Sequence, residues 1–161
     1  MKTMKIYLKQ TLLLLAYHPI AYFSGMLISG IVGVILGFFI KIDFITTSQY
    51  YDPVVMTIAP LIVLFLLVFR DGCISNAFSP RFIALCAVPT FIIQHLCTLH
   101  NIDGMVTTGS CTALTYALFP NQNGFSQPEY YMVMLGIQLL LHLPTILLAY
   151  YCGFRCKSKK S

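Results

Sequence analysis

The chain has 161 residues, of which 58% are hydrophobic and 9% are charged, with a net charge of +5. Soluble domains carry about 25% charged residues, so a water-soluble fold of this size would lack the polar side chains needed to cover its surface. The composition excludes an ordinary soluble domain. It predicts an integral membrane protein that forms a single membrane domain over residues 1–161.

Residues 1–19 have the pattern of a basic amphipathic helix. Lys2, Lys5 and Lys9 share one face of a helix, while apolar side chains occupy another face. Such a helix suits the surface of an anionic inner leaflet. The helix is predicted to break at His18-Pro19, because the residue before a proline avoids the helical region.

Four later segments are apolar enough to cross about 30 Å of hydrocarbon, which takes about 20 helical residues. Their apolar runs are continuous rather than alternating, which favours helices that satisfy their own backbone hydrogen bonds in lipid. The predicted fold class is therefore all-α, a polytopic bundle of four transmembrane helices preceded by the amphipathic helix. The predicted spans are residues 20–40, 53–69, 82–99 and 130–151.

The first predicted span carries a row of small residues at every fourth position. We call this row the small-residue stripe. Small side chains let two helices approach closely, which is the main source of helix packing in lipid. The stripe predicts a contact surface, either with the other spans of the same chain or with another protein. Its members are Ala21, Gly25, Ser29, Gly33 and Gly37.

Each of the other three spans contains a proline, and the last two also contain polar residues. Pro60, Pro89 and Pro144 predict kinks, which transporters and channels often use to line a site. Ionisable residues inside a membrane suggest a functional site, although plain hydrogen bonding between helices is an equal alternative. The residues of this candidate polar path are Gln94, His95, Gln138 and His142.

An outer loop is predicted over residues 100–129, between the last two spans. Its segment 105–119 is short and rich in Thr, so we interpret it as an interfacial or re-entrant helix rather than a fifth span. Cys97 and Cys111 fall on this outer side and are candidates for a disulfide in an oxidising compartment. Cys152 and Cys156 lie at the inner edge of the last span, where palmitoylation and simple burial are alternatives.

The distribution of basic residues predicts the orientation of the chain. With four crossings, Lys41 alone of the ten Lys and Arg residues falls on the outer side. The positive-inside rule then predicts a protein of the cell membrane, inner or plasma, with both termini on the cytoplasmic side. The tail KSKKS, with Lys157 and Lys159, resembles the dilysine retrieval signal of endoplasmic-reticulum membrane proteins. That resemblance implies the endoplasmic reticulum if the source is eukaryotic, and a basic membrane anchor is the alternative reading.

No sequence motif of an enzyme, a cofactor site, a metal site or a nucleic-acid interface occurs in the chain. We therefore expect no catalytic residues and no cofactor, and a protein that is more plausibly not an enzyme. The first hypothesis is a small non-enzymatic subunit that acts through helix–helix association in the lipid bilayer. Its partner is a second copy or another membrane protein. The alternative is a small transporter or channel that uses the candidate polar path.

Overall fold

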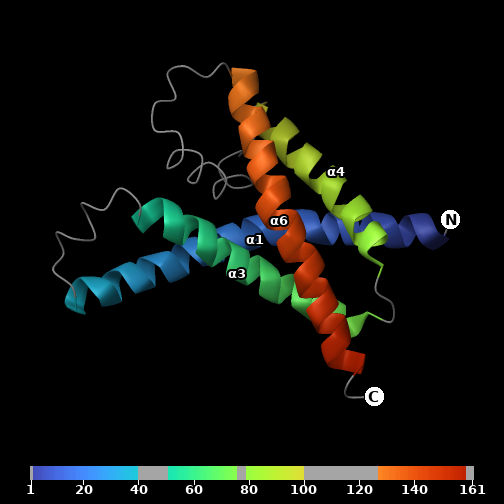
Figure 1. Cartoon of the computed structure of the whole chain (residues 1–161), viewed down its shortest axis with the longest axis horizontal. Helices are drawn as coiled ribbons and strands as arrows, with labels where there is room; N and C mark the ends of the chain where they lie inside the picture. The colour runs from blue at the N-terminus through green and yellow to red at the C-terminus, as the bar shows by residue number, and fades with distance from the viewer. Residues whose placement is uncertain (1, 40–50, 76–78, 100–126, 159–161) are drawn as a thin grey trace.

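The computed structural model describes residues 2–39, 51–75, 79–99 and 127–158, and every element of regular structure in these ranges is an α-helix. The all-helical prediction is thereby confirmed. The helices overlap all four predicted apolar segments, and each extends further than predicted at one end or at both (Figure 1). They are α1 (Lys2–Phe39), α3 (Tyr51–Ile74), α4 (Pro80–Leu99) and α6 (Gln127–Ser158).

Three of these helices are long and apolar enough to cross a membrane. The segments that meet this condition are Met4–Ile35 in α1, Thr57–Ile74 in α3 and Leu135–Ser158 in α6. The described apolar part of α4, Pro80–Gln94, is shorter. Three candidate spans thus follow from length and composition, and a fourth crossing by α4 stays a prediction.

The break predicted at His18-Pro19 does not occur. α1 continues through Pro19 for 38 residues, so the amphipathic segment and the first predicted span form one helix. Pro19 cannot donate a backbone hydrogen bond to the carbonyl of Leu15, and this normally weakens a helix. Tyr17 and Ala21, on either side of the proline, are both buried in the core. Packing on these neighbours holds the helix together at this point.

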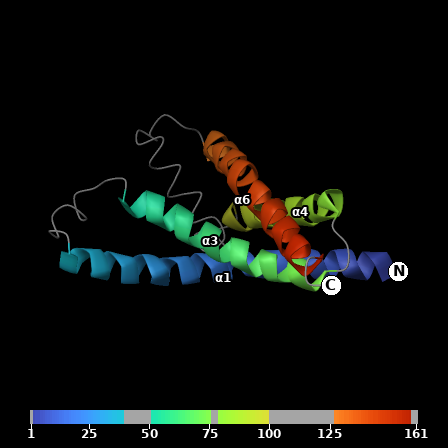
Figure 2. The ribbon, with the colours of Figure 1, turned by 60° about the horizontal axis from the view of Figure 1, so that its bottom comes forward.

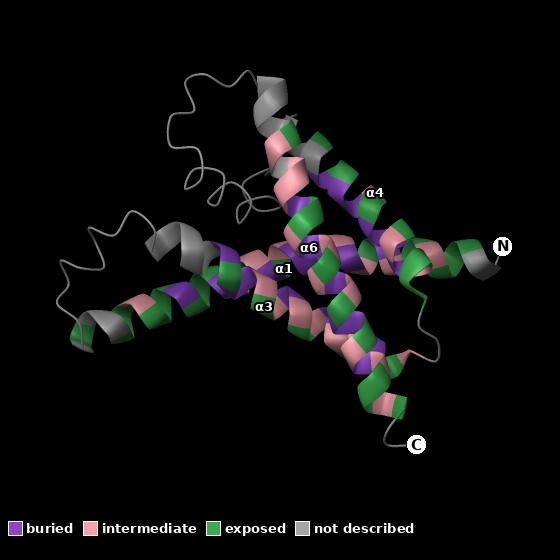
Figure 3. Ribbon diagram, viewed as in Figure 1, coloured by how far each residue is buried: buried purple, intermediate pink, exposed green. Residues whose placement is uncertain are grey.

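The four helices contact one another in a ring. α3 returns beside α1, and α6 packs against α3, while α4 packs against both α1 and α6. Figures 1 and 2 show α4 and α6 lying obliquely across α1 on the same side of it. The buried side chains concentrate where the helices cross (Figure 3). The core is formed by Leu14, Tyr17, Ala21, Leu64, Val68, Ile83, Cys86, Ala87, Phe91, Ile146, Ala149 and Tyr150.

The crossing of α3 and α6 depends on two glycines. A Cβ atom on Gly72 would collide with the backbone carbonyl of Tyr150, and a Cβ atom on Gly153 would collide with the carbonyl of Phe69. The obstructing atoms belong to the backbone, so a side-chain rotation cannot relieve the collision. The two helices are therefore in direct backbone contact, which a larger residue at either position would prevent. We call this contact the glycine crossing.

The distal end of α1 has far fewer contacts. Figures 1 and 2 both show the end of α1 diverging from α3. A Cβ atom on Gly30 would meet no described atom within 4 Å. Phe38 is 85% exposed, and Val34 and Ile35 are also exposed. This end of the molecule thus presents an apolar surface around a single helix.

The basic ends of the helices gather on one side of the molecule. The beginning of α1, the end of α3, the beginning of α4 and the end of α6 lie near one another in Figure 1. Tyr7 of α1 donates a hydrogen bond to the carbonyl of Leu85 in α4. Lys157 of α6 donates to the carbonyl of Ser75, just after α3, at 3.1 Å. The cytoplasmic orientation of this end stays a prediction from the sequence.

Candidate polar site in the helix core

The helix core contains a hydrogen-bonded pair of glutamines. Gln138 of α6 donates a hydrogen bond through Nε2 to Oε1 of Gln94 in α4. Both side chains are fully buried. A buried amide in an apolar core is costly unless it is hydrogen-bonded, so the pair links α4 to α6 at a fixed relative position. Two residues of the candidate polar path are therefore in direct contact.

One helical turn further along α6, His142 lies against His18 of α1. The ring of His142 is 5.4 Å from the ring of His18, centroid to centroid, with an angle of 55° between the planes. Phe91 of α4 lies against both rings, at 5.7 Å from His18 and 6.4 Å from His142. Three helices therefore meet at these rings, all of which are buried. We call this group the histidine junction.

His18 is the member of the junction that has an unsatisfied atom. Its side chain is 5% exposed, and Nε2 has no hydrogen-bond partner among the described residues. Buried polar atoms are nearly always hydrogen-bonded, so each exception needs an explanation. Sequence reasoning placed His18 outside the membrane at a helix break and missed its place in the core. The signal was available, because a histidine between apolar helical turns is itself a candidate functional residue.

Several residues singled out from the sequence lie outside the described part of the molecule. His95 belongs to α4 and Gly37 to α1, but the side-chain surroundings of both positions are not described. The same applies to the side chain of Cys97, to Cys111 and to the segment 105–119. The expectations for these residues stay predictions.

The small-residue stripe lies against α3 at Gly25. Ala21, Gly25 and Ser29 are buried. A Cβ atom on Gly25 would lie 2.6 Å from the ring and backbone nitrogen of Pro60, so the α1 backbone touches the α3 proline. Gly33 is half-buried. The first half of the stripe is therefore a contact surface within the chain.

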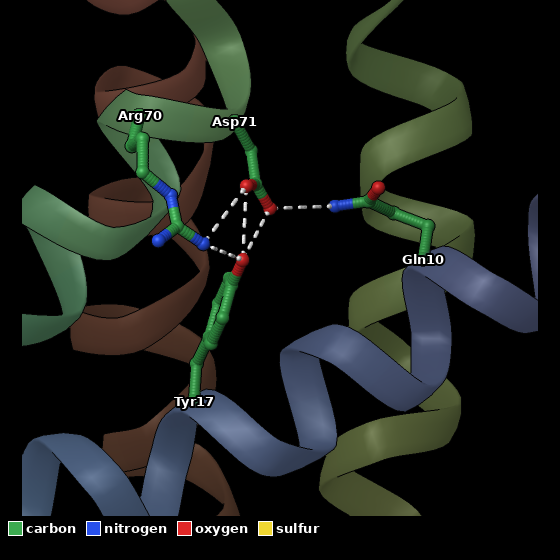
Figure 4. Close-up of polar contacts among 4 residues, drawn as sticks. All are labelled: Gln10, Tyr17, Arg70 and Asp71. Atoms are coloured by element: carbon green, nitrogen blue, oxygen red, sulfur yellow. Dashed lines mark hydrogen bonds and ion pairs between the residues drawn. The ribbon is translucent and has the colours of Figure 1, made fainter. Parts of the chain in front are cut away.

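A second polar cluster joins α1 to the end of α3 (Figure 4). The hydroxyl of Tyr17 lies 2.9 Å from both carboxylate oxygens of Asp71 and donates to them. Gln10 donates to the same carboxylate at 3.4 Å, and Arg70 donates to the Tyr17 hydroxyl at 3.1 Å. We call this group the Asp71 cluster. It was not predicted, because Asp71 was assigned to a connection rather than to the last turns of a helix.

The charges of the Asp71 cluster are unequally buried. The side chain of Asp71 is 13% exposed, whereas that of Arg70 is 63% exposed, and their nearest charged atoms are 3.8 Å apart. An exposed ion pair of this kind contributes little to stability. Tyr17 and Gln10, which donate hydrogen bonds to Asp71, are therefore the main partners of the partly buried carboxylate. They tie α1 to α3 within the end of the molecule that carries the basic residues.

The side chains of these groups can donate and accept hydrogen bonds, and the two imidazole rings can bind protons. In residues 2–39, 51–75, 79–99 and 127–158, no group of three or more His, Cys, Asp or Glu side chains is placed to hold a metal ion. Comparisons of the chain with protein-family models, with curated proteins and with solved structures found no match.

Proposed function

We propose that the chain is a small multi-pass membrane protein that acts as a non-enzymatic subunit through helix–helix association. Its apolar composition and its three candidate spans support the membrane location. The observation that supports the proposal most directly is that the helices contact one another at glycine residues. Gly25, Gly72 and Gly153 each bring their own helix against another helix more closely than any side chain would allow.

The partner surface that we propose is the second half of the small-residue stripe. Gly25 in its first half lies against Pro60 of α3, but the end of α1 diverges from α3 (Figure 1). The sequence repeats the same spacing at Gly33 and Gly37. A second copy of the chain, or a helix of another membrane protein, would complete this part of the stripe.

The test replaces both distal glycines by isoleucine. We expect Gly33→Ile with Gly37→Ile to abolish the higher-mass species when the protein is extracted from its native membrane in mild detergent and sized by native mass spectrometry. Gly30→Ile is the matched control, because Gly30 lies on the same stretch of helix and a Cβ atom there would meet no described atom within 4 Å. Unchanged assembly in the double variant would reject the proposed seam.

We also propose that both termini face the cytoplasm, with the basic ends of the helices at the inner surface. Reporter fusions at the C-terminus and within residues 100–129 test this orientation. The C-terminal fusion should report the cytoplasm and the loop fusion the opposite side. A cytoplasmic signal from the loop would reject the four-span topology. An endoplasmic-reticulum location in a eukaryotic host is tested by Lys157→Ala with Lys159→Ala, which should release the protein from that membrane.

A second candidate function is transport along a polar path through Gln94, His95, Gln138 and His142. The contact between the two glutamines, and the place of His142 one turn away, favour it. His95→Ala with His142→Ala should then abolish a flux across reconstituted vesicles. A flux that is indifferent to both substitutions would remove the candidate path.

A further inference from the structure

We propose that His18 and His142 form a proton-binding site in which one proton is shared between α1 and α6. The two rings are 5.4 Å apart, both are buried, and Nε2 of His18 has no hydrogen-bond partner among the described residues. An orphaned ring nitrogen beside a second imidazole is the arrangement from which an N–H···N hydrogen bond forms. The inference rests on the second candidate function and names its ligand.

A proton fits the histidine junction better than a larger ligand does. Phe91 packs against both rings and fills the side that faces α4. No third His, Cys, Asp or Glu joins the pair to complete a metal site in the described ranges. A metal ion would keep its full charge in an apolar interior with only two neutral donors, which is unfavourable. A shared proton needs nothing beyond the two ring nitrogens.

The geometry of the pair allows the shared bond after a small movement. An N–H···N bond needs nitrogen atoms about 3 Å apart. In the structure the ring centroids are 5.4 Å apart and the planes are inclined at 55°, so the shared bond requires the rings to rotate about their side-chain bonds until two nitrogens reach this distance. Proton uptake would therefore add a direct bond between α1 and α6, which otherwise pack mainly through α3 and α4.

The groups around the junction limit it to one proton. α4 contributes Phe91, Thr90 and Gln94, and α6 contributes Gln138, all of which are neutral. Asp71 of α3 bonds to Tyr17, the residue before His18, and its carboxylate is already engaged by Tyr17, Gln10 and Arg70 in the Asp71 cluster. A second proton would place two like charges side by side in an apolar core without an opposing charge. The two histidines should therefore titrate as one coupled pair.

The experiment is a histidine titration by NMR on the full chain in nanodiscs. With ¹⁵N-labelled histidine, we expect one proton to bind to the pair between about pH 8 and about pH 4, a range that covers ordinary histidine titration. We expect His142→Phe, which keeps an aromatic ring in place, to change the proton affinity of His18 about tenfold or more. His18→Phe should have the reciprocal effect on His142.

The control variant is His100→Ala, which removes one histidine of the four and should leave the titration midpoint of the pair unchanged. If the two rings bind two protons independently, or if neither ring binds a proton in this range, the site is rejected. The number of protons that the wild-type pair binds tests the site even if a variant fails to fold. Flux is measured separately in vesicles. A shared proton without any flux would reject transport and keep the site, whereas independent titration would reject the site whatever the flux.

Discussion

The two ends of the molecule use glycine in opposite ways. At the glycine crossing, Gly72 and Gly153 bring α3 and α6 into backbone contact. At the distal end of α1, a Cβ atom on Gly30 would meet no described atom within 4 Å, and its neighbours expose apolar side chains. Glycine therefore allows close contact between two helices in one region, whereas in the other it lies on a helix face that no described helix contacts. The difference is set by whether a second helix lies opposite, which the residue itself does not reveal.

The largest expected effect is at the glycine crossing. Gly153→Ala should destabilise the protein by about 3 kcal/mol or more, because the new methyl group meets the backbone carbonyl of Phe69 and α6 must move away. Unfolding in mixed micelles with increasing SDS measures the loss. Gly136→Ala in the same helix is the control, since a Cβ atom there meets nothing within 4 Å. Equal stability of the two variants would contradict the backbone contact.

The next effect is at the contact between α1 and α3. Gly25→Ala should cost about 2 kcal/mol, because its methyl group would lie 2.6 Å from the rigid ring of Pro60. The same unfolding assay measures it. Replacement of both contact partners, by Gly25→Ala with Pro60→Ala, should recover part of the loss. A double variant that is less stable than the sum of the single variants would argue against this contact.

A smaller effect is expected in the Asp71 cluster. Tyr17→Phe removes the hydroxyl that donates to the Asp71 carboxylate, and should cost about 1 kcal/mol because the cluster is only partly buried. Tyr22→Phe, on the same helix, is the control. Its ring packs against Phe23, and its hydroxyl takes no part in the cluster. If both variants were equally stable, the hydrogen bonds of the Asp71 cluster would not contribute to the stability of the contact between α1 and α3.

The smallest effect is expected at the open end. Gly30→Ala should leave stability unchanged or raise it by about 0.5 to 1 kcal/mol, because alanine is the better helix former and finds no steric conflict here. Thermal unfolding in detergent measures this difference. A clear loss of stability would contradict the open surroundings of Gly30 and would disqualify it as the control position for the distal glycines.

Hydropathy was sufficient to predict a helix over each apolar segment, because continuous apolar runs leave few alternatives to a helix, but it did not predict that α1 continues through Pro19. The small-residue stripe also identified the face on which Gly25 meets Pro60. The glycine crossing was not predicted, since Gly72 and Gly153 are isolated in sequence and acquire their role only when α3 and α6 cross. No local pattern encodes that crossing.

The polar groups show the same limit. Gln138 and His142 share a helix face by their spacing, and that was visible in the sequence. Their partners Gln94 and His18 come from other helices, so only the three-dimensional arrangement pairs them. The rule that a residue before proline avoids the helix was the wrong guide at His18. Core packing on both sides of Pro19 outweighed the local preference.

The uninterrupted course of α1 gives this helix a length that can be compared with the thickness of a bilayer. The apolar stretch Met4–Ile35 has 32 residues and is about 48 Å long, against a hydrocarbon thickness of about 30 Å. An inserted helix of this length must lean steeply, thicken the lipid around it, or leave part of its apolar surface outside. Each of these responses depends on acyl-chain length. Bilayer thickness would then act on the angle at which α1 meets the other three helices, and longer-chain lipids should favour its more upright position.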